Sequence, residues 1–146
     1  MIEKIKALVR EKDTCVLATV SDDSPHCSLM SYVTDAECRE IYMVTHRETK
    51  KYRNLQKNPA ASLLIDTRAG DAPGVPRDVI AALTINATFQ KIDDAAKRKY
   101  AREKLLERHP GLREFITDPD AEIIAVRCRS FQLLEGIRDS YFITVD

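Results

Sequence analysis

Strict alternation between apolar and polar side chains in residues 79–92 is the sequence feature that most constrains the fold. The stretch reads VIAALTINATFQKI, in which Leu83, Ile85, Ala87 and Phe89 alternate with Thr84, Asn86, Thr88 and Gln90. Successive side chains of a strand point to opposite faces of a sheet, so this run predicts a strand with one buried and one polar face. The polar face is expected to lie in solvent or to line a subunit contact, and the alternation is compatible with both.

Shorter apolar runs, separated by polar turns, predict further strands. We expect strands at 15–20, 26–33, 40–45 and 60–66, and two or three more within 122–146. Short polar turns join the first three, which predicts an antiparallel meander. Apolar side chains at helical spacing, together with capping residues, predict helices at 2–10, 49–57 and 93–109.

This order of elements favours a mainly β fold over a parallel βαβ sheet. We expect an antiparallel split β-barrel of about six to eight strands with a few flanking helices. The chain has 146 residues, which suits a single domain spanning 1–146. Residues 67–78 hold two of the four glycines and are expected to form a loop, long enough to cover a site or a partner.

The composition argues against several classes of function. Lysine plus arginine equals aspartate plus glutamate, at 23 each, so no net positive charge argues for nucleic acid. No apolar run approaches the roughly 20 residues of a membrane span, and the charged N-terminus lacks the apolar centre of a signal peptide. We therefore expect a cytoplasmic protein. The four cysteines form no C-x-x-C pair, which favours reduced thiols over a metal site.

Residues 45–59, THRETKKYRNLQKNP, combine features of an anion site. Thr45 ends an apolar run, Thr49 precedes the expected helix, and Lys50 and Lys51 fall in its first turn. The first N–H groups of a helix have no internal partner, and the helix dipole favours negative charge there. Two lysines at that end are unfavourable unless an anion binds between them. The alternative is that Thr49 caps a surface helix whose lysines are solvated.

The stretch from Thr14 to Asp66 resembles the pyridoxamine 5'-phosphate oxidase-like, FMN-binding split-barrel family. The matching pieces are VLATV with a polar turn and Pro25-His26, the strand HCSLMSYV, the strand end YMVT, and TKKYRNLQKNPAASLLI. By order of elements the resemblance covers most of the chain. It implies an FMN cofactor and a homodimer with the flavin at the subunit interface.

The resemblance also assigns residues to the cofactor. It implies a phosphate site at Thr45, Thr49, Lys50 and Lys51. It further implies that the second strand runs beside the flavin ring, through Cys27, Ser28, Leu29, Met30 and Ser31, with His26 just ahead of them. A second chain is expected to complete the site, and Arg77 is the candidate residue. The alternative for this segment is an ordinary strand with one core face.

The chain departs from the oxidase itself at several positions. Cys27 and Tyr32 stand where the oxidase has basic residues at the ends of the flavin segment, and Ala82 stands where it has a glutamine. Only Arg138 remains of its substrate motif near the C-terminus. We therefore expect a divergent flavin-binding relative, without vitamin B6 chemistry.

The leading hypothesis is an FMN-dependent oxidoreductase that transfers a hydride or electrons to a small molecule. No side chain is predicted to be catalytic, because the cofactor supplies the redox chemistry. One rival is a non-enzymatic flavin- or haem-binding module, with His26 or His46 as the axial ligand of a haem. Another is a ligand-free interaction domain. A deazaflavin in place of FMN is a variant of the first hypothesis.

Overall fold

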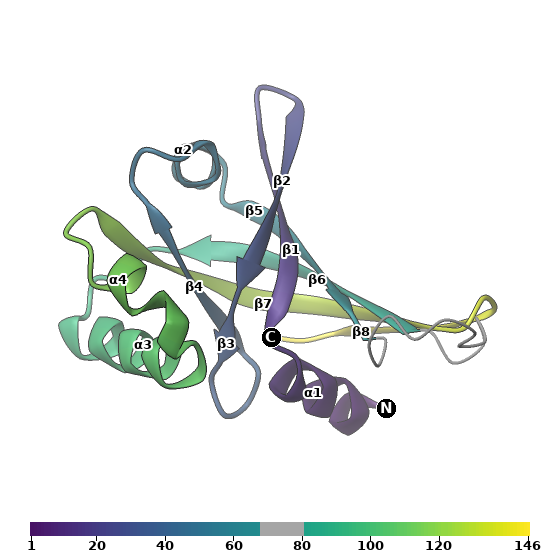
Figure 1. The fold of residues 1–146 in the computed structure, drawn as a ribbon. Coiled ribbons are helices and arrows are strands. Elements are labelled where there is room, and N and C mark those ends of the chain that lie inside the picture. The colour runs from purple at the N-terminus through teal and green to yellow at the C-terminus, as the bar shows by residue number, and fades with distance from the viewer. Residues whose placement is uncertain (68–80) are drawn as a thin grey trace.

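The computed structural model describes residues 1–67 and 81–146 and has a mainly β fold. Its strands form one antiparallel sheet that curls into an open half-barrel flanked by helices (Figure 1). The strands are β1 (Thr14–Ser21), β2 (Ser24–Ser31), β3 (Val33–Thr34), β4 (Glu40–His46), β5 (Ala60–Asp66), β6 (Ala81–Gln90), β7 (Ala121–Glu135) and β8 (Asp139–Thr144). The helices are α1 (Ile2–Glu11), α2 (Lys50–Lys57), α3 (Ala95–Arg108) and α4 (Arg113–Ile116), with a short 3₁₀ helix η2 (Pro110–Leu112). The predicted split barrel is confirmed.

The strand order along the sheet is β2-β1-β5-β6-β7-β4-β3, and β8 pairs with β7. The alternating run lies at the centre of this sheet as β6, between β5 and β7. Leu83 and Ile85 are fully buried, as the alternation predicted, and Asn86 is exposed on the other face. Apart from Thr67, the predicted loop at 67–78 lies outside the described residues, and so does Arg77.

The predicted three-stranded meander is wrong. β1 and β2 form a hairpin, but β4 pairs with β3 and β7 instead of β2. All four residues Ile41–Val44 are buried, so both faces of β4 are covered. Ile41 and Met43 pack into one hydrophobic cluster, whereas Tyr42 and Val44 pack into another. With one hydrophobic cluster on each of its faces, β4 is an interior strand of the sheet, paired with β7 on one side and with β3 on the other.

The expected strand 26–33 is interrupted at Tyr32, which separates β2 from β3. The Tyr32 side chain is 1% exposed, and its hydroxyl donates a hydrogen bond to the Val9 carbonyl at 2.7 Å. The Tyr32 backbone N–H donates to the Asp13 carbonyl at 2.9 Å. These two bonds fix the end of β2 against α1 and the start of β1.

Two hydrophobic clusters form the core. The larger lies inside the half-barrel and includes Ile5 and Val9 of α1. The smaller lies between the sheet and the helices α3 and α4, which sit side by side next to β4 (Figure 1). Asp93 and Asp94 were both candidate caps for α3, and Asp94 is the one that accepts a hydrogen bond from the Ala96 N–H, at 2.9 Å. The short α4 was not predicted.

Three of the four cysteines are buried and all four are free thiols. Burial raises the pKa of Cys15 and of Cys128 to about 12. The fourth, Cys27, is exposed on β2. Within residues 1–67 and 81–146, no cluster of histidine, cysteine and carboxylate side chains has the grouping of a metal site. Over the same residues, no helix has the length and hydropathy needed to span a membrane.

Candidate functional site

A cavity of about 240 Å³ lies where β2, β4, α2, η2 and α4 meet. It joins the two segments that the sequence singled out, the second strand and the start of the helix at 49–57. Its lining residues are Leu29, Met30, Ser31, Val44, Lys51, Leu112 and Phe115. Four of the ten predicted cofactor residues are therefore brought together in one cavity.

The start of α2 is held by a pair of threonine hydroxyls. Thr45, at the end of β4, is 1% exposed, and its Oγ1 lies 2.7 Å from Oγ1 of Thr49. The Thr49 hydroxyl also donates to the His46 carbonyl at 2.9 Å. Thr49 is the N-cap residue of α2, but its side chain does not cap the helix. Among the described residues, no side chain accepts a hydrogen bond from the first amides of α2, which leaves them open to an anion.

Lys50 and Lys51 form no salt bridge with any residue in the part of the chain that the structure describes. Lys50 is exposed, whereas Lys51 is partly buried and lines the cavity. A lysine without a counter-ion at the wall of a cavity can form charge-assisted hydrogen bonds with a bound anion. Of the two lysines, Lys51 is the one that lines the cavity.

Buried contacts on the other face of α2 fix Lys51 in place. The Asn54 side chain is buried and donates to Oγ1 of Thr19 in β1 at 3.1 Å. The Tyr52 ring packs edge-on against Phe89 of β6, with ring centroids 6.5 Å apart. Burial raises the pKa of the Tyr52 phenol, and the Glu122 carboxylate adds to the shift. The helix is thus anchored to two strands of the barrel.

β2 offers a free backbone edge beside the cavity. One edge pairs with β1 along the whole strand, and no other described strand pairs with the opposite edge. An unpaired edge presents N–H and C=O groups that a heterocyclic ring edge can use. Met30 is buried, but Leu29 is 79% exposed, which is unusual for a leucine without a partner. His26, Cys27 and Ser28 lie farther along the hairpin and do not line the cavity.

Three lining residues were not expected at this site from the sequence: Val44 of β4, Leu112 and Phe115. Leu112 and Phe115 come from η2 and α4 and close the side of the cavity opposite β2. The Phe115 ring stacks on His46 of β4, with centroids 4.5 Å apart and planes 8° from parallel. Nε2 of His46 is buried and has no hydrogen-bond partner. The spacing of Leu112, Phe115 and Ile116 was a usable signal for a short amphipathic helix after Pro110-Gly111.

The residues present fit a flavin phosphate and ring, with one shortfall. Lys51 and the open α2 amides suit a phosphate, and the β2 edge suits a polar ring edge. However, pockets that enclose a drug-sized ligand measure roughly 300–1,000 Å³. The cavity of about 240 Å³ in one chain is smaller, so a single chain supplies only part of such a site.

Sequence comparison decides the family. The profile of the pyridoxamine 5'-phosphate oxidase family matches residues 1–134. The chain belongs to this family. No curated protein matches the chain significantly.

Solved structures share the family fold at low sequence identity. A haem-binding protein from Mycobacterium smegmatis superposes with a TM-score of 0.84 at 19% identity, covering 98% of this chain and 57% of that one. General Stress Protein 26 from Bacillus anthracis gives 0.70 at 20% identity, covering 99% and 98%. An FAD-binding protein from Mesorhizobium loti gives 0.71 at 12% identity, covering 90% and 91%. This split barrel therefore occurs in one protein named for FAD binding and in one named for haem binding.

Proposed function

We propose that the chain binds FMN in the cavity between β2 and α2 and acts as a flavin-dependent oxidoreductase. In this proposal Lys51 and the first amides of α2 bind the phosphate, and Lys50 adds positive charge from the surface. Thr45 and Thr49 hold the end of β4 against α2 and can turn their hydroxyls toward the phosphate. The free edge of β2, from Cys27 to Ser31, faces the flavin ring, with His26 just before it.

The observation that carries this proposal is the position of Lys51. Lys51 is partly buried, forms no salt bridge among the described residues and lines the same cavity as Leu29–Ser31. The alternative interpretation is a solvated surface lysine, and the position of Lys51 beside the second strand supports the phosphate site over it. Family membership adds support, because FMN binding was the expectation that the resemblance raised.

The chain's own residues would position the cofactor and shield it. A bound FMN would supply two-electron redox chemistry, with a reduced nicotinamide as a candidate donor and a small molecule as acceptor. Leu112, Phe115 and Val44 form an apolar wall that limits water around the ring. The β2 backbone would donate to and accept from the polar ring edge, and these bonds set its electron affinity.

We further propose that two chains form a homodimer that completes the site. Cross-strand partners project from the same face of a sheet, and the register links Leu29 to Val16 and Val16 to Leu64. This row of cross-strand partners continues from Leu64 through Thr84 of β6 and Gln132 of β7 to Phe142 of β8. Leu29, Leu64 and Phe142 are 79%, 44% and 62% exposed, so one face of the sheet carries large apolar side chains. A second copy covering this face would bury them and enlarge the small cavity.

Titration of the purified protein with FMN, followed by flavin fluorescence, tests the binding. We expect saturable quenching at one FMN per chain, and bleaching of the bound flavin on anaerobic addition of NADH or NADPH. If FMN binds but neither NADH nor NADPH bleaches it, the protein would be a flavin carrier, and the proposed oxidoreductase activity would be rejected. Absence of binding would remove the proposal altogether.

Light scattering after gel filtration tests the dimer. We expect twice the chain mass for the wild type, and a monomer with weakened FMN binding for Leu64→Lys, which changes the sheet face but not the cavity lining. A wild type that is monomeric while it binds FMN would contradict the shared site.

Haem is the second candidate ligand, because one observation favours it. Nε2 of His46 is buried, has no partner, and belongs to a ring stacked on the cavity-lining Phe115. Imidazole nitrogen is a common axial ligand of haem iron. If haem binds here, haemin gives a Soret band that shifts in His46→Ala, whereas FMN binding survives that substitution. An unchanged band in His46→Ala excludes His46 as the ligand.

A further inference from the structure

A second cavity, of about 300 Å³, lies on the other side of α4 from the candidate flavin site. Leu112 and Phe115 line the first cavity, whereas Ile116 and Thr117 line the second. Its remaining walls come from α3 and from the start of β7. The cavity is bordered by α3, by the end of α4 with the turn that follows it, and by the start of β7. The helices α3 and α4 lie side by side (Figure 1).

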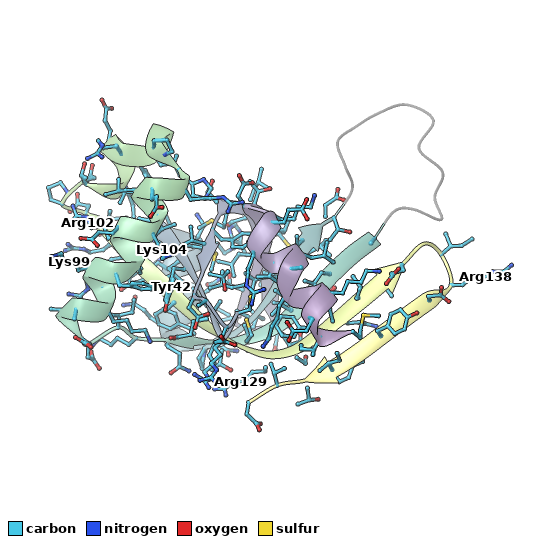
Figure 2. The ribbon with its side chains drawn as sticks, turned by 90° about the horizontal axis from the view of Figure 1, so that it is seen from below. Tyr42, Lys99, Arg102, Lys104, Arg129 and Arg138 are labelled. Carbon is cyan, nitrogen blue, oxygen red and sulfur yellow. The ribbon has the colours of Figure 1, made fainter. Side chains whose placement is uncertain are left out.

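One wall of this cavity carries two arginines. Arg98 and Arg102 are one turn apart on α3, so their side chains share a face of that helix. One guanidinium nitrogen of Arg98 donates to the Ile92 carbonyl at 2.7 Å. Arg102, labelled in Figure 2, makes no hydrogen bond or salt bridge with any residue in 1–67 or 81–146. Both arginines are exposed, and most of their guanidinium donors have no protein partner among the described residues.

The carboxylates on the facing walls are already engaged. Glu122 forms a salt bridge with Arg47 at 3.0 Å, on the strand neighbouring β7. Oδ1 of Asp118 accepts a hydrogen bond from the Asp120 N–H at 2.8 Å. Neither contact involves Arg98 or Arg102. A backbone N–H does not neutralise a carboxylate, so Asp118 keeps its negative charge. With Glu122 paired to Arg47, the two guanidinium groups leave one excess positive charge among the described lining residues.

The floor of the cavity is apolar. Ile116 is 3% exposed and Ile123 packs against the same hydrophobic cluster between the sheet and α3. A site with guanidinium donors on one wall and branched aliphatic side chains below suits a ligand with an anionic group and a compact apolar body. Inorganic phosphate would use only the first of these features, and a neutral aromatic molecule only the second.

We propose that this cavity, between α3, the end of α4 and the start of β7, binds a small organic carboxylate. Arg102 and Arg98 bind the carboxylate, and Ile116 and Ile123 contact the apolar body. The site is separate from the candidate flavin cavity and does not depend on flavin binding.

Amide chemical shifts of the full-length protein, titrated with three probes, test this inference. The probes are benzoate, benzyl alcohol with the same ring and no charge, and inorganic phosphate with charge and no ring. We expect benzoate to shift the amides of Thr117 and Ile123 and to bind more tightly than either other probe, with an affinity that falls as salt is added. If benzoate and benzyl alcohol bound equally tightly, the proposed role of the arginines in binding a carboxylate would be wrong. If phosphate bound as tightly as benzoate, the proposed contact of Ile116 and Ile123 with an apolar body would be wrong.

Two matched variants on α3 separate the cavity from general surface charge. Arg102→Gln removes the unpaired guanidinium and is expected to weaken benzoate binding roughly tenfold, the usual size of a lost charge-assisted hydrogen bond. Lys99→Gln removes one positive charge from the same helix, at a residue that does not line the cavity, and is expected to bind as the wild type does. Similar losses in both variants, or shifts confined to residues away from this cavity, would overturn the proposal.

Discussion

Replacing Lys51 by alanine is expected to weaken FMN binding while leaving riboflavin binding unchanged. Lys51 lines the cavity beside β2 and lies in the first turn of α2. The N-cap side chain of that helix accepts no hydrogen bond from its first backbone N–H groups. Riboflavin has the same ring as FMN but lacks the phosphate. The difference between the two ligands therefore isolates the contribution of the lysine to phosphate binding from any effect on the ring.

The expected magnitude follows from the environment of Lys51. A hydrogen bond to a charged group contributes about 1.5–3 kcal/mol. Lys51 is only partly buried, so solvent screening places its contribution near the lower end of that range. A loss of about 1.5 kcal/mol corresponds to a dissociation constant for FMN that is roughly tenfold higher.

The assay is fluorescence titration of wild type, Lys51→Ala and Lys57→Ala with each flavin. Lys57 is exposed in the last turn of the same helix, so its removal changes the charge of α2 without changing the cavity. Lys57→Ala is expected to match the wild type. An equal loss of FMN and riboflavin affinity in Lys51→Ala, or an equal loss in both variants, would refute the assignment of Lys51 to the phosphate.

Two further predictions concern stability. Asn54→Ala removes the buried bond to Thr19 and is expected to lower the free energy of unfolding by about 1–3 kcal/mol in urea titrations; an unchanged midpoint would show that this bond does not anchor α2. Cys15 and Cys128 have pKa values raised by burial from 9.0 to about 12, so the folded state keeps protons that the unfolded state loses as the pH rises above 9. Stability is therefore expected to fall by about 1.4 kcal/mol per thiol between pH 8 and pH 10, and a double Cys→Ala variant should lose that part of the slope.

Local patterns in the sequence predicted the elements on which the site depends. The alternation around Leu83 and Ile85 identified β6, because burial of one face imposes a period of two. Thr49 and Asn58-Pro59 located α2 within one residue of its bounds, because capping residues and proline act on neighbouring backbone groups. The junction between β4 and α2, with Lys51 in the first helical turn, was therefore placed correctly.

The pairing of β4 and the closure of the cavity were not predicted from the sequence. Pairing with β7 joins His46 to Ala121, and no local pattern encodes a contact over that separation. The sequence also showed hydroxyls at Thr45 and Thr49 but not that they would bond to each other. The stack of Phe115 on His46 depends on packing of α4 against β4, which only the tertiary structure shows.

The visible absorption spectrum of the purified protein, before and after addition of FMN and removal of unbound ligand, tests the central claim most directly. The account predicts flavin bands that remain with the wild type and reach one FMN per chain at saturation. At FMN concentrations near the wild-type dissociation constant, it predicts clearly weaker bands for Lys51→Ala treated in the same way. A colourless protein that retains no FMN at any concentration would contradict it, and THRETKKYRNLQKNP would then be a surface helix with solvated lysines.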